Sequence, residues 1–376
     1  MIPLSRHFIT GTELNYISQV LFGGHTSGDG IFTKKCQSLM EEAFGAKRVL
    51  LTHSCTAALE MAAMLCNIKS GDEVILPSFT FVSTANAFYI RGAKPIFVDI
   101  RKDTLNIDET KIEKAITKRT KVIVPVHYAG VGCEMDTIMD IARQHNLYVV
   151  EDAAQGVDAK YKDKYLGTIG DIGTYSFHET KNYTCGEGGA IILNDERFIE
   201  RAEIVREKGT DRDKFFRGEV DKYTWVDVGS SYLPSDITAA VLYSQLENMD
   251  IIGYKREDIF NYYYHNLSSS DNFTLPYIPP ECASNNHIFY IILKDKNTRD
   301  RLIAYLKSMG IVAVFHYIPL HLSKIGMDLG YKKGQFPITE SISNRLLRLP
   351  LYNDLTQKDQ DYIINCIKKF FSMRME

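Results

Sequence analysis

The sequence predicts an α/β fold with a mostly parallel central sheet, followed by a smaller α+β unit. Between residues 48 and 195, short apolar runs alternate with segments of helical periodicity, which is typical of strands joined by crossover helices. The texture changes after a proline-containing segment at residues 276–280. The chain has 376 residues and is 45% hydrophobic, enough for more than one hydrophobic core. We therefore expect a large domain over residues 1–252, N-terminal segment included, and a small domain over residues 253–376.

Short apolar segments of the first half are predicted to be buried strands. They lie at residues 48–52, 73–76, 94–98, 122–126 and 148–152. The helices predicted between them lie at residues 56–68, 82–91, 109–116 and 135–145. Two further strands, at residues 173–177 and 189–193, flank a polar turn that is rich in glycine. In such sheets ligands bind beyond the carboxyl ends of the parallel strands, so that edge is the expected site.

The second half is predicted to be more helical. Helices are expected at residues 199–208, 234–248 and 252–267, with a long polar and aromatic loop at residues 211–225. The small domain should contain strands at 287–293 and 311–316, and helices at 298–308, 340–347 and 356–371.

Composition excludes several classes of protein. The net charge of −3 does not suggest a nucleic acid or a membrane surface as a partner. No apolar stretch approaches the roughly 18 residues of a membrane-spanning helix, and the first residues lack the apolar core of a signal peptide. The seven cysteines include no C-x-x-C pair, which favours reduced thiols in the cytoplasm over disulfides or a metal site.

Lys181 and Asp152 together predict a site for pyridoxal phosphate (PLP). Asp152 ends a predicted strand, and Lys181 lies in the polar turn, ahead of a Gly-Glu-Gly-Gly segment. A lysine amine can form a Schiff base with an aldehyde, and a carboxylate can keep the pyridine nitrogen of the cofactor protonated. Taken singly, a lysine in a turn is usually solvated surface, and an aspartate after a strand can cap a helix. Desolvation should lower the pKa of Lys181 and leave its amine free to react.

Other residues at this edge suit the same cofactor. Ser54 and Thr56 open a predicted helix, whose N-terminal N–H groups suit a phosphate; the alternative is an ordinary capped helix. Phe81 could stack on a flat ring or belong to the core. Gln155 could bond the ring hydroxyl. Cys55 could have a lowered pKa at the helix start, or be a small structural residue.

The motifs around these residues resemble the DegT/StrS family of sugar aminotransferases over essentially the whole chain. They are Phe-His-Glu-Thr-Lys181-Asn, Glu-Asp152-Ala-Ala-Gln155, Ser-Cys-Thr56-Ala-Ala-Leu and Thr-Phe81-Val-Ser-Thr-Ala-Asn-Ala. The resemblance implies a fold-type I PLP-dependent architecture. It also implies a homodimer with active sites shared at the subunit interface.

The resemblance assigns roles residue by residue. It makes Lys181 the Schiff-base lysine and general base, Asp152 the partner of the pyridinium nitrogen, Phe81 the stacking aromatic and Gln155 the neighbour of the ring hydroxyl. The implied phosphate-binding residues are Cys55, Thr56 and Ser176. Many members also carry an asparagine that reaches the neighbouring subunit's phosphate, in a Gly-x-Asn-Tyr-Arg segment. Here that segment reads Gly-Ser-Ser-Tyr-Leu, so Ser231 stands at the asparagine's place.

Further motifs resemble one branch of the family. They are Gly-Ser-Ser-Tyr-Leu, His-Tyr-Ala-Gly-Val and Cys-Glu-Met-Asp-Thr-Ile-Met. The implied reaction moves an amino group from L-glutamate to C4 of dTDP-4-dehydro-6-deoxy-D-glucose. It gives dTDP-4-amino-4,6-dideoxy-D-galactose for the enterobacterial common antigen, and 2-oxoglutarate. The glucose epimer, or another nucleotide-linked 4-keto-6-deoxy sugar, remains an alternative.

Reactions and functions of other classes are less consistent with these residues. Related sugar dehydratases carry a histidine at the position of Lys181, so the lysine favours transamination. A nicotinamide dehydrogenase should have a G-x-G-x-x-G segment after the first strand, where Ser54-Cys55-Thr56 stands instead. A non-catalytic regulator that retains the fold would not need Lys181 and Asp152.

Substrate contacts are expected from the predicted small domain. His316, Tyr317 and His321 follow a predicted strand and could close over a hexose. The alternative is a packed strand end with satisfied histidines. The basic and aromatic loop at residues 208–225 could meet the diphosphate or form a subunit interface.

Overall fold

The centre of the molecule is a seven-stranded sheet with the order β1-β9-β8-β5-β4-β2-β3. The computed structural model describes residues 1–268 and 270–372. The strands of this sheet are β1 (Arg48–Thr52), β2 (Glu73–Pro77), β3 (Lys94–Val98), β4 (Thr120–Ile123), β5 (Tyr148–Asp152), β8 (Ile172–Ser176) and β9 (Gly189–Leu193). Only β9 runs against its neighbours, β1 and β8. The predicted α/β fold with a mostly parallel sheet is confirmed.

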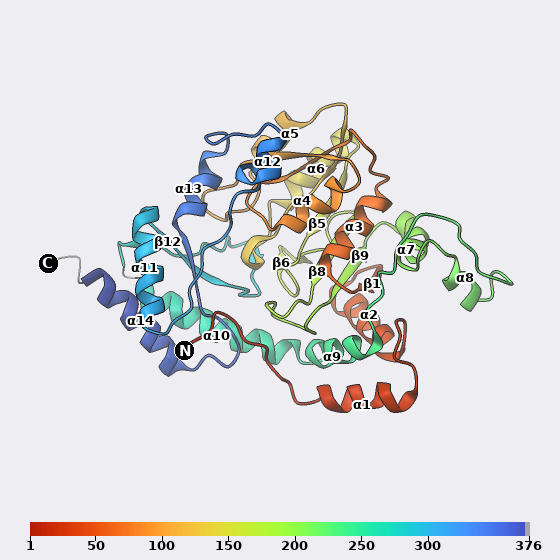
Figure 1. Cartoon of the computed structure of the whole chain (residues 1–376), viewed down its shortest axis with the longest axis horizontal. Coiled ribbons are helices and arrows are strands. Elements are labelled where there is room, and N and C mark those ends of the chain that lie inside the picture. The colour runs from red at the N-terminus through yellow and green to blue at the C-terminus, as the bar shows by residue number, and fades with distance from the viewer. Residues whose placement is uncertain (269, 373–376) are drawn as a thin grey trace.

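Helices cover both faces of this sheet (Figure 1). They are α2 (Ile31–Phe44), α3 (Cys55–Leu65), α4 (Val82–Tyr89), α5 (Ile112–Ala115), α6 (Met135–His145), α7 (Ile199–Arg206) and α9 (Asp236–Leu246). Helix α1 (Glu13–Gly23) packs against α9. Successive strand residues point to opposite faces. Val49 and Leu51 of β1 therefore pack with α2, α6 and α9, whereas Leu50 packs with α3, α4 and α7.

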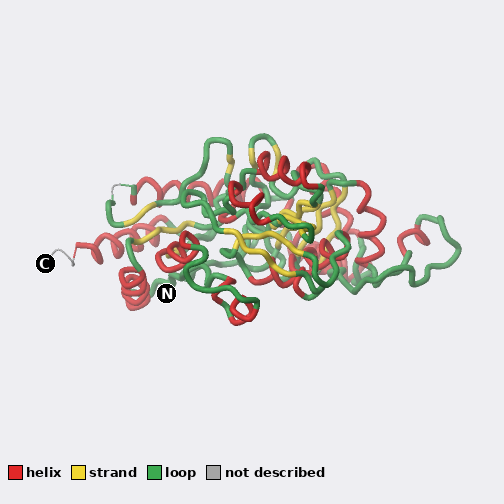
Figure 2. The backbone as a smooth tube through the Cα atoms, turned by 90° about the horizontal axis from the view of Figure 1, so that it is seen from above, coloured by secondary structure: helices red, strands yellow, loops and turns green. Residues whose placement is uncertain are grey.

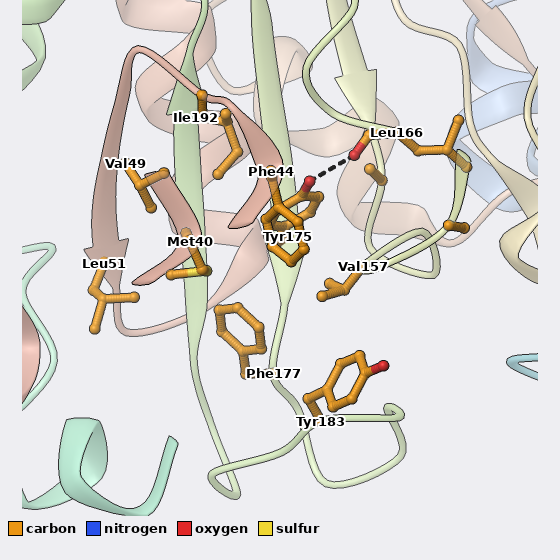
Figure 3. Packing of buried hydrophobic residues seen from close by; sticks show 14 of the residues in the cluster. Met40, Phe44, Val49, Leu51, Val157, Leu166, Tyr175, Phe177, Tyr183 and Ile192 are labelled. Carbon is orange, nitrogen blue, oxygen red and sulfur yellow. Dashed lines mark hydrogen bonds between the residues drawn. The ribbon is translucent and has the colours of Figure 1, made fainter. Parts of the chain in front are cut away.

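Aromatic residues of β8 and the turn after it anchor the first of these two cores. Figure 3 shows Tyr175 and Phe177 beside Met40 and Phe44 of α2. The Tyr175 hydroxyl donates a 2.6 Å hydrogen bond to the carbonyl of Leu166, so this buried polar group is satisfied. These contacts fix the position of β8, the strand that ends at the predicted site.

A second unit follows helix α10 (Met249–Leu267), which extends away from the sheet in line with α9 (Figure 1). It contains a three-stranded antiparallel sheet with its own core. Its elements are β10 (Phe273–Thr274), β12 (Phe289–Leu293), α11 (Lys296–Ser308), α12 (Lys324–Asp328), α13 (Pro337–Arg345), β13 (Leu346–Leu349) and α14 (Gln357–Ser372). The first residues contact this unit, since Ile2 bridges to Ile311. The boundary near residue 252 stays a proposal, and these first residues lie against the C-terminal unit.

Several predicted elements differ from the structure. The strand predicted at 122–126 ends at Ile123, shortly before Pro125, which has no N–H for the ladder. Residues 311–316 form only single bridges at Ile311 and Val314. Besides β10, the strand that pairs with β12 is β13, whose first two residues we predicted as the end of a helix. The apolar side chains of β13 favour burial in the sheet over continuation of α13.

Several elements were not predicted. Helices α1 and α2 lie in the first 47 residues, and α8 (Arg212–Phe216) lies within the predicted loop at 211–225. The loop carries α8 away from the body of the molecule, as both views show (Figures 1 and 2). A short three-stranded sheet of β6 (Lys160–Tyr161), β7 (Lys164–Tyr165) and β11 (Cys282–Ala283) joins the two units. Among the described residues, the helices are all too short or too polar to span a bilayer.

Candidate functional site

A cavity of about 520 Å³ lies at the carboxyl ends of the parallel strands. Asp152 and Ser176, the last residues of β5 and β8, form its floor, and the start of α3 forms one wall. The predicted site residues that line it are Lys181, Asp152, Gln155, Ser176, Cys55, Thr56, Phe81, His316 and Tyr317. Its volume is that of a small-molecule site.

The turn that carries Lys181 is held from two sides. Its backbone is closed by bonds from Lys181 N to the His178 carbonyl (2.9 Å) and from Glu179 N to the Gly186 carbonyl (2.8 Å). The next residue, Asn182, donates to the Asn285 carbonyl and accepts from His287 Nδ1, both at 2.8 Å. The second unit therefore helps to fix the position of the lysine.

Burial favours the uncharged form of the Lys181 amine. Burial lowers the pKa of Lys181 from its usual value, against the opposing influence of Cys55 and Asp152; the nearby positive charge of Arg348 lowers it further. Lys181 lines the cavity. A desolvated, unprotonated amine is the form that attacks a carbonyl.

The glycine-rich exit of this turn allows close packing beneath the cavity. A Cβ atom at Gly189 would lie 2.4 Å from the backbone nitrogen of Cys55. Only glycine lets β9 lie this close to the first turn of α3. The glycine at position 189 thus has a steric reason.

Asp152 presents a buried carboxylate to the cavity. Its oxygens accept bonds from Thr84 Oγ1 (2.6 Å) and from the backbone N–H of Ala154 (3.2 Å). No helix follows β5 directly, so the alternative role of a helix cap does not apply. The preceding residue, Glu151, points to the other face and accepts three backbone N–H groups and His127 Nε2. Two adjacent carboxylates thus have separate tasks.

The start of α3 offers the predicted anion site. Ser54 caps the helix by accepting from Ala57 N at 3.1 Å, and Thr56 Oγ1 lies 2.8 Å from Ser83 Oγ. Ser54 therefore both caps α3 and lines the cavity. Burial raises the pKa of the Cys55 thiol, so Cys55 is a small structural residue and not an activated nucleophile.

Phe81 projects into the open part of the cavity. Its side chain is 60% exposed, which rules out the alternative of a core phenylalanine. An aromatic face left open beside Asp152 and Lys181 has room to stack on a planar ring. The stacking itself stays a prediction.

A chain of polar contacts links Gln155 to the second unit. Gln155 accepts from Ala129 N (2.7 Å) and donates to the Tyr317 hydroxyl (2.9 Å). The Tyr317 ring stacks on His316 with centroids 4.0 Å apart. Arg348 Nη1 donates to His316 Nε2 at 2.6 Å, because an arginine has only donors. His316 Nδ1 therefore carries the proton and meets the Tyr128 hydroxyl at 3.2 Å.

Two predicted residues do not reach the cavity. His321 is fully buried; Nδ1 meets Ser78 Oγ at 2.7 Å and Nε2 meets Glu340 at 3.1 Å. It is a packed histidine with satisfied nitrogens, the alternative stated above, and not a sugar contact. Ser231 is exposed and bridges to Glu207 through its backbone. Within one chain it lies outside the cavity, so its expected phosphate contact requires a partner subunit.

The structure adds residues that the sequence analysis missed. Ser83, Thr84, His287 and Arg348 also line the cavity. Arg348 could have been noticed, since it interrupts the apolar run of β13, where a charged residue is costly unless it has a partner or a function. The contact between Thr84 and Asp152 joins residues far apart in sequence, and no local pattern indicates it.

The residues of the cavity fit pyridoxal phosphate. Lys181 can hold the aldehyde, Asp152 lies in the wall to pair with a ring nitrogen, and the first N–H groups of α3 with Thr56 and Ser176 can bind a phosphate. Phe81 and Gln155 line the same cavity, and their contacts with the ring and its hydroxyl stay predictions.

The sequence matches the DegT/DnrJ/EryC1/StrS aminotransferase family over residues 8–368. It is 39% identical to an uncharacterized protein of Methanocaldococcus jannaschii over 99% of this chain and 98% of that protein. It is 33% identical to the spore coat polysaccharide biosynthesis protein SpsC of Bacillus subtilis, over 98% of this chain and 96% of SpsC. The putative sugar aminotransferase Spr1654 of Streptococcus pneumoniae, in its PMP form, superimposes with a TM-score of 0.93 at 26% identity, covering 98% of this chain and 99% of that one. The chain belongs to the DegT/DnrJ/EryC1/StrS aminotransferase family.

Proposed function

We propose that the protein is a PLP-dependent sugar-nucleotide aminotransferase. It transfers the amino group of L-glutamate to C4 of dTDP-4-dehydro-6-deoxy-D-glucose, as a dTDP-4-amino-4,6-dideoxygalactose transaminase does. The observation that carries the proposal is that the desolvated Lys181 and the carboxylate of Asp152 line one cavity. The names of SpsC and Spr1654 support a sugar as the acceptor.

Each residue of the site has one task in this proposal. Bound pyridoxal phosphate supplies an electron sink for the carbanion formed during amino transfer. Asp152, held by Thr84, keeps the ring nitrogen protonated. The N-terminus of α3 and Ser176 bind the phosphate, and Phe81 covers the ring face.

Lys181 also moves the proton. With pyridoxal phosphate bound, the Lys181 amine would act as the general base that removes the proton from the α-carbon of glutamate, and it would hold that proton for return later in the half-reaction. With the keto sugar the steps reverse, which predicts ping-pong kinetics. The lowered pKa of Lys181 keeps a larger fraction of the amine in the basic form that this task needs.

The identity of the sugar rests on the resemblance to one branch of the family. The motifs that carry it are Gly-Ser-Ser-Tyr-Leu at 229–233 and His-Tyr-Ala-Gly-Val at 127–131. The C4 configuration depends on which face of the sugar meets the cofactor, so the glucose epimer is the competing product. The product would enter a cell-surface polysaccharide such as the enterobacterial common antigen.

We further propose a cytoplasmic homodimer. All seven cysteines are free, which suits a reducing compartment. Ser231 is exposed in one chain, so it can reach a phosphate only in a partner's site.

Absorption spectroscopy tests the proposal. The purified protein with added pyridoxal phosphate should show the visible band of a lysine-bound cofactor, and L-glutamate should abolish it. Borohydride should fix the cofactor on Lys181, and Lys181→Ala is the control. A missing band, or labelling of another lysine, would contradict the proposal. NMR of the product formed from a panel of nucleotide-linked keto sugars then decides between the two epimers.

A further inference from the structure

Arg348 brings a positive charge into the cavity from the second unit. It lies on β13 between Leu347 and Leu349, both buried in the core of that unit. The strand alternates, so its neighbours face inward while Arg348 faces the site. Its backbone pairs with Val314, which fixes the base of the side chain.

This guanidinium has no acidic partner in the part of the chain that the structure describes. Its single hydrogen bond there joins Nη1 to the uncharged ring of His316, and Nε is buried without a partner. The two carboxylates of the cavity wall are engaged elsewhere. Asp152 accepts from Thr84 and Ala154, and Glu187 is largely exposed beside His178. A buried cation without a counter-charge is costly, so a ligand is expected to supply one.

We propose that Arg348 binds a carboxylate of the amino donor through the edge formed by Nε and Nη2. The bond to His316 occupies Nη1, and neither Nε nor Nη2 has a hydrogen-bond partner among the described residues. Its two parallel N–H groups match the two oxygens of a carboxylate. The inference rests on the proposed function, which it extends to the residue that recognises glutamate.

A carboxylate fits this position better than the diphosphate of the sugar nucleotide. The diphosphate is attached at C1, across the hexose ring from the reacting C4. When C4 lies at Lys181, the diphosphate extends away from the reacting centre. Arg348 lies close enough to Lys181 to lower the pKa of that lysine. The donor carries a carboxylate on the carbon that reacts at Lys181, so it can meet both residues at once.

His316 is the positioning residue for this contact. It accepts from Arg348, donates to Tyr128 and stacks on Tyr317, so the guanidinium is held in one orientation. Burial and the charge of Arg348 lower the pKa of His316 to about 2. The His316 ring therefore remains an acceptor for Arg348 throughout the neutral pH range. Because the ring is uncharged, it does not compete with Arg348 for the carboxylate of the donor.

Binding of glutarate to the PLP-loaded enzyme tests the proposal. Glutarate has the carboxylates of glutamate but no amine, so calorimetry measures recognition without reaction. Arg348→Gln should weaken glutarate binding by about tenfold to a hundredfold, the loss expected for charge-assisted hydrogen bonds. Arg348→Lys, which keeps the charge but not the fork, should fall between Arg348→Gln and the wild type. The KM for glutamate should rise, while the half-reaction with the keto sugar changes by less than threefold.

A matched control and a second ligand make the outcome decisive. Arg119→Gln removes the same charge at an exposed side chain and should bind glutarate as the wild type does. Wild-type affinity for glutarate in a folded Arg348→Gln enzyme overturns the proposal. So does a loss confined to the sugar nucleotide, which would assign Arg348 to the diphosphate. If glutamate fails to convert the cofactor in the wild-type enzyme, the proposed function fails, whatever the glutarate result.

Discussion

At the scale of single residues, the site contains cationic side chains whose charged forms are disfavoured by burial. Desolvation lowers the pKa of Lys181, His287 and His316 from their usual values. The two imidazoles are neutral near pH 7, and Arg348 brings a positive charge to the cavity. Because these pKa values differ between the folded and the unfolded state, the stability of the protein depends on pH.

Lys181 should destabilise the cofactor-free protein. The pKa of Lys181 is lower in the folded than in the unfolded state, so protonation of this lysine disfavours folding. The loss of stability is complete at pH values below the pKa of the folded state, and it vanishes above the pKa of the unfolded state. Lys181→Met should therefore raise the thermal midpoint of the apoprotein at pH 7. The gain should shrink as the pH approaches about 10.5, the ordinary pKa of lysine. Calorimetry at both pH values checks this, and an equal gain at both would contradict it.

The buried histidines should make the protein sensitive to mild acid. Below pH about 6.5 the unfolded chain binds protons at His287 and His316 that the folded chain does not bind, so stability falls as pH falls. Each contributes at most about 1.4 kcal/mol per pH unit. His287 donates through Nδ1 to Asn182 Oδ1, and His287→Asn preserves a donor. This variant should lose less of its thermal midpoint between pH 6.5 and 5 than the wild type; a parallel decline would refute the assignment.

At the scale of elements, helices of one segment are capped by acids of another. Asp99, just after β3, accepts from Ile338 N (3.1 Å) and Thr339 N (2.8 Å) at the start of α13. Asp236 of α9 accepts in the same way from Phe32 N and Thr33 N at the start of α2. These long-range caps tie α13 to the main sheet and α2 to α9.

Removal of the long-range cap on α13 should cost more than removal of a local cap. Asp99→Ala leaves two backbone N–H groups and the Thr339 hydroxyl without an acceptor, which should destabilise the protein by about 1–3 kcal/mol. Asp108→Ala, which removes the local cap from the 3₁₀ helix at Glu109–Lys111, is the control and should cost about 1 kcal/mol or less. Denaturant unfolding measures both. Equal losses would show that the Asp99 contact does not hold the two units together.

At the scale of the whole molecule, one chain forms most of a site, but its own Ser231 lies outside that site. The exposed position of Ser231 predicts that each site of a homodimer is completed by the other subunit. Two inactive variants should then complement each other. Ser231→Asp repels a phosphate, and Lys181→Ala removes the anchoring amine.

Mixed subunits test this prediction. After unfolding and joint refolding, half of the dimers pair the two variants, and one of their two sites is intact, so about a quarter of wild-type activity should return. Ser230→Asp places the same charge one residue away and should retain activity. A mixture that stays inactive, or a fully active Ser231→Asp enzyme, would place Ser231 away from the phosphate.

Much of the site could be predicted because its residues lie next to the strand ends that carry them. Asp152 ends one apolar run, and Thr56 lies at the start of a helix that directly follows another apolar run. In a parallel sheet such ends meet at one edge. His321 could not be placed in this way, since its partners Ser78 and Glu340 come from distant segments. A histidine after a presumed strand has the same local pattern whether it packs inside or faces a ligand.

The sequence by itself determined the alternation of strands and helices, the edge at which ligands bind, and the pairing of Lys181 with Asp152. These depend on local periodicity and on residue chemistry, both of which are encoded within short segments. Only the tertiary structure decided that β13 pairs with β12 and brings Arg348 to the cavity without an acidic partner among the described residues. Burial and pairing are set by contacts between segments that are distant in sequence, because desolvation depends on everything that surrounds a group and not on its neighbours in sequence.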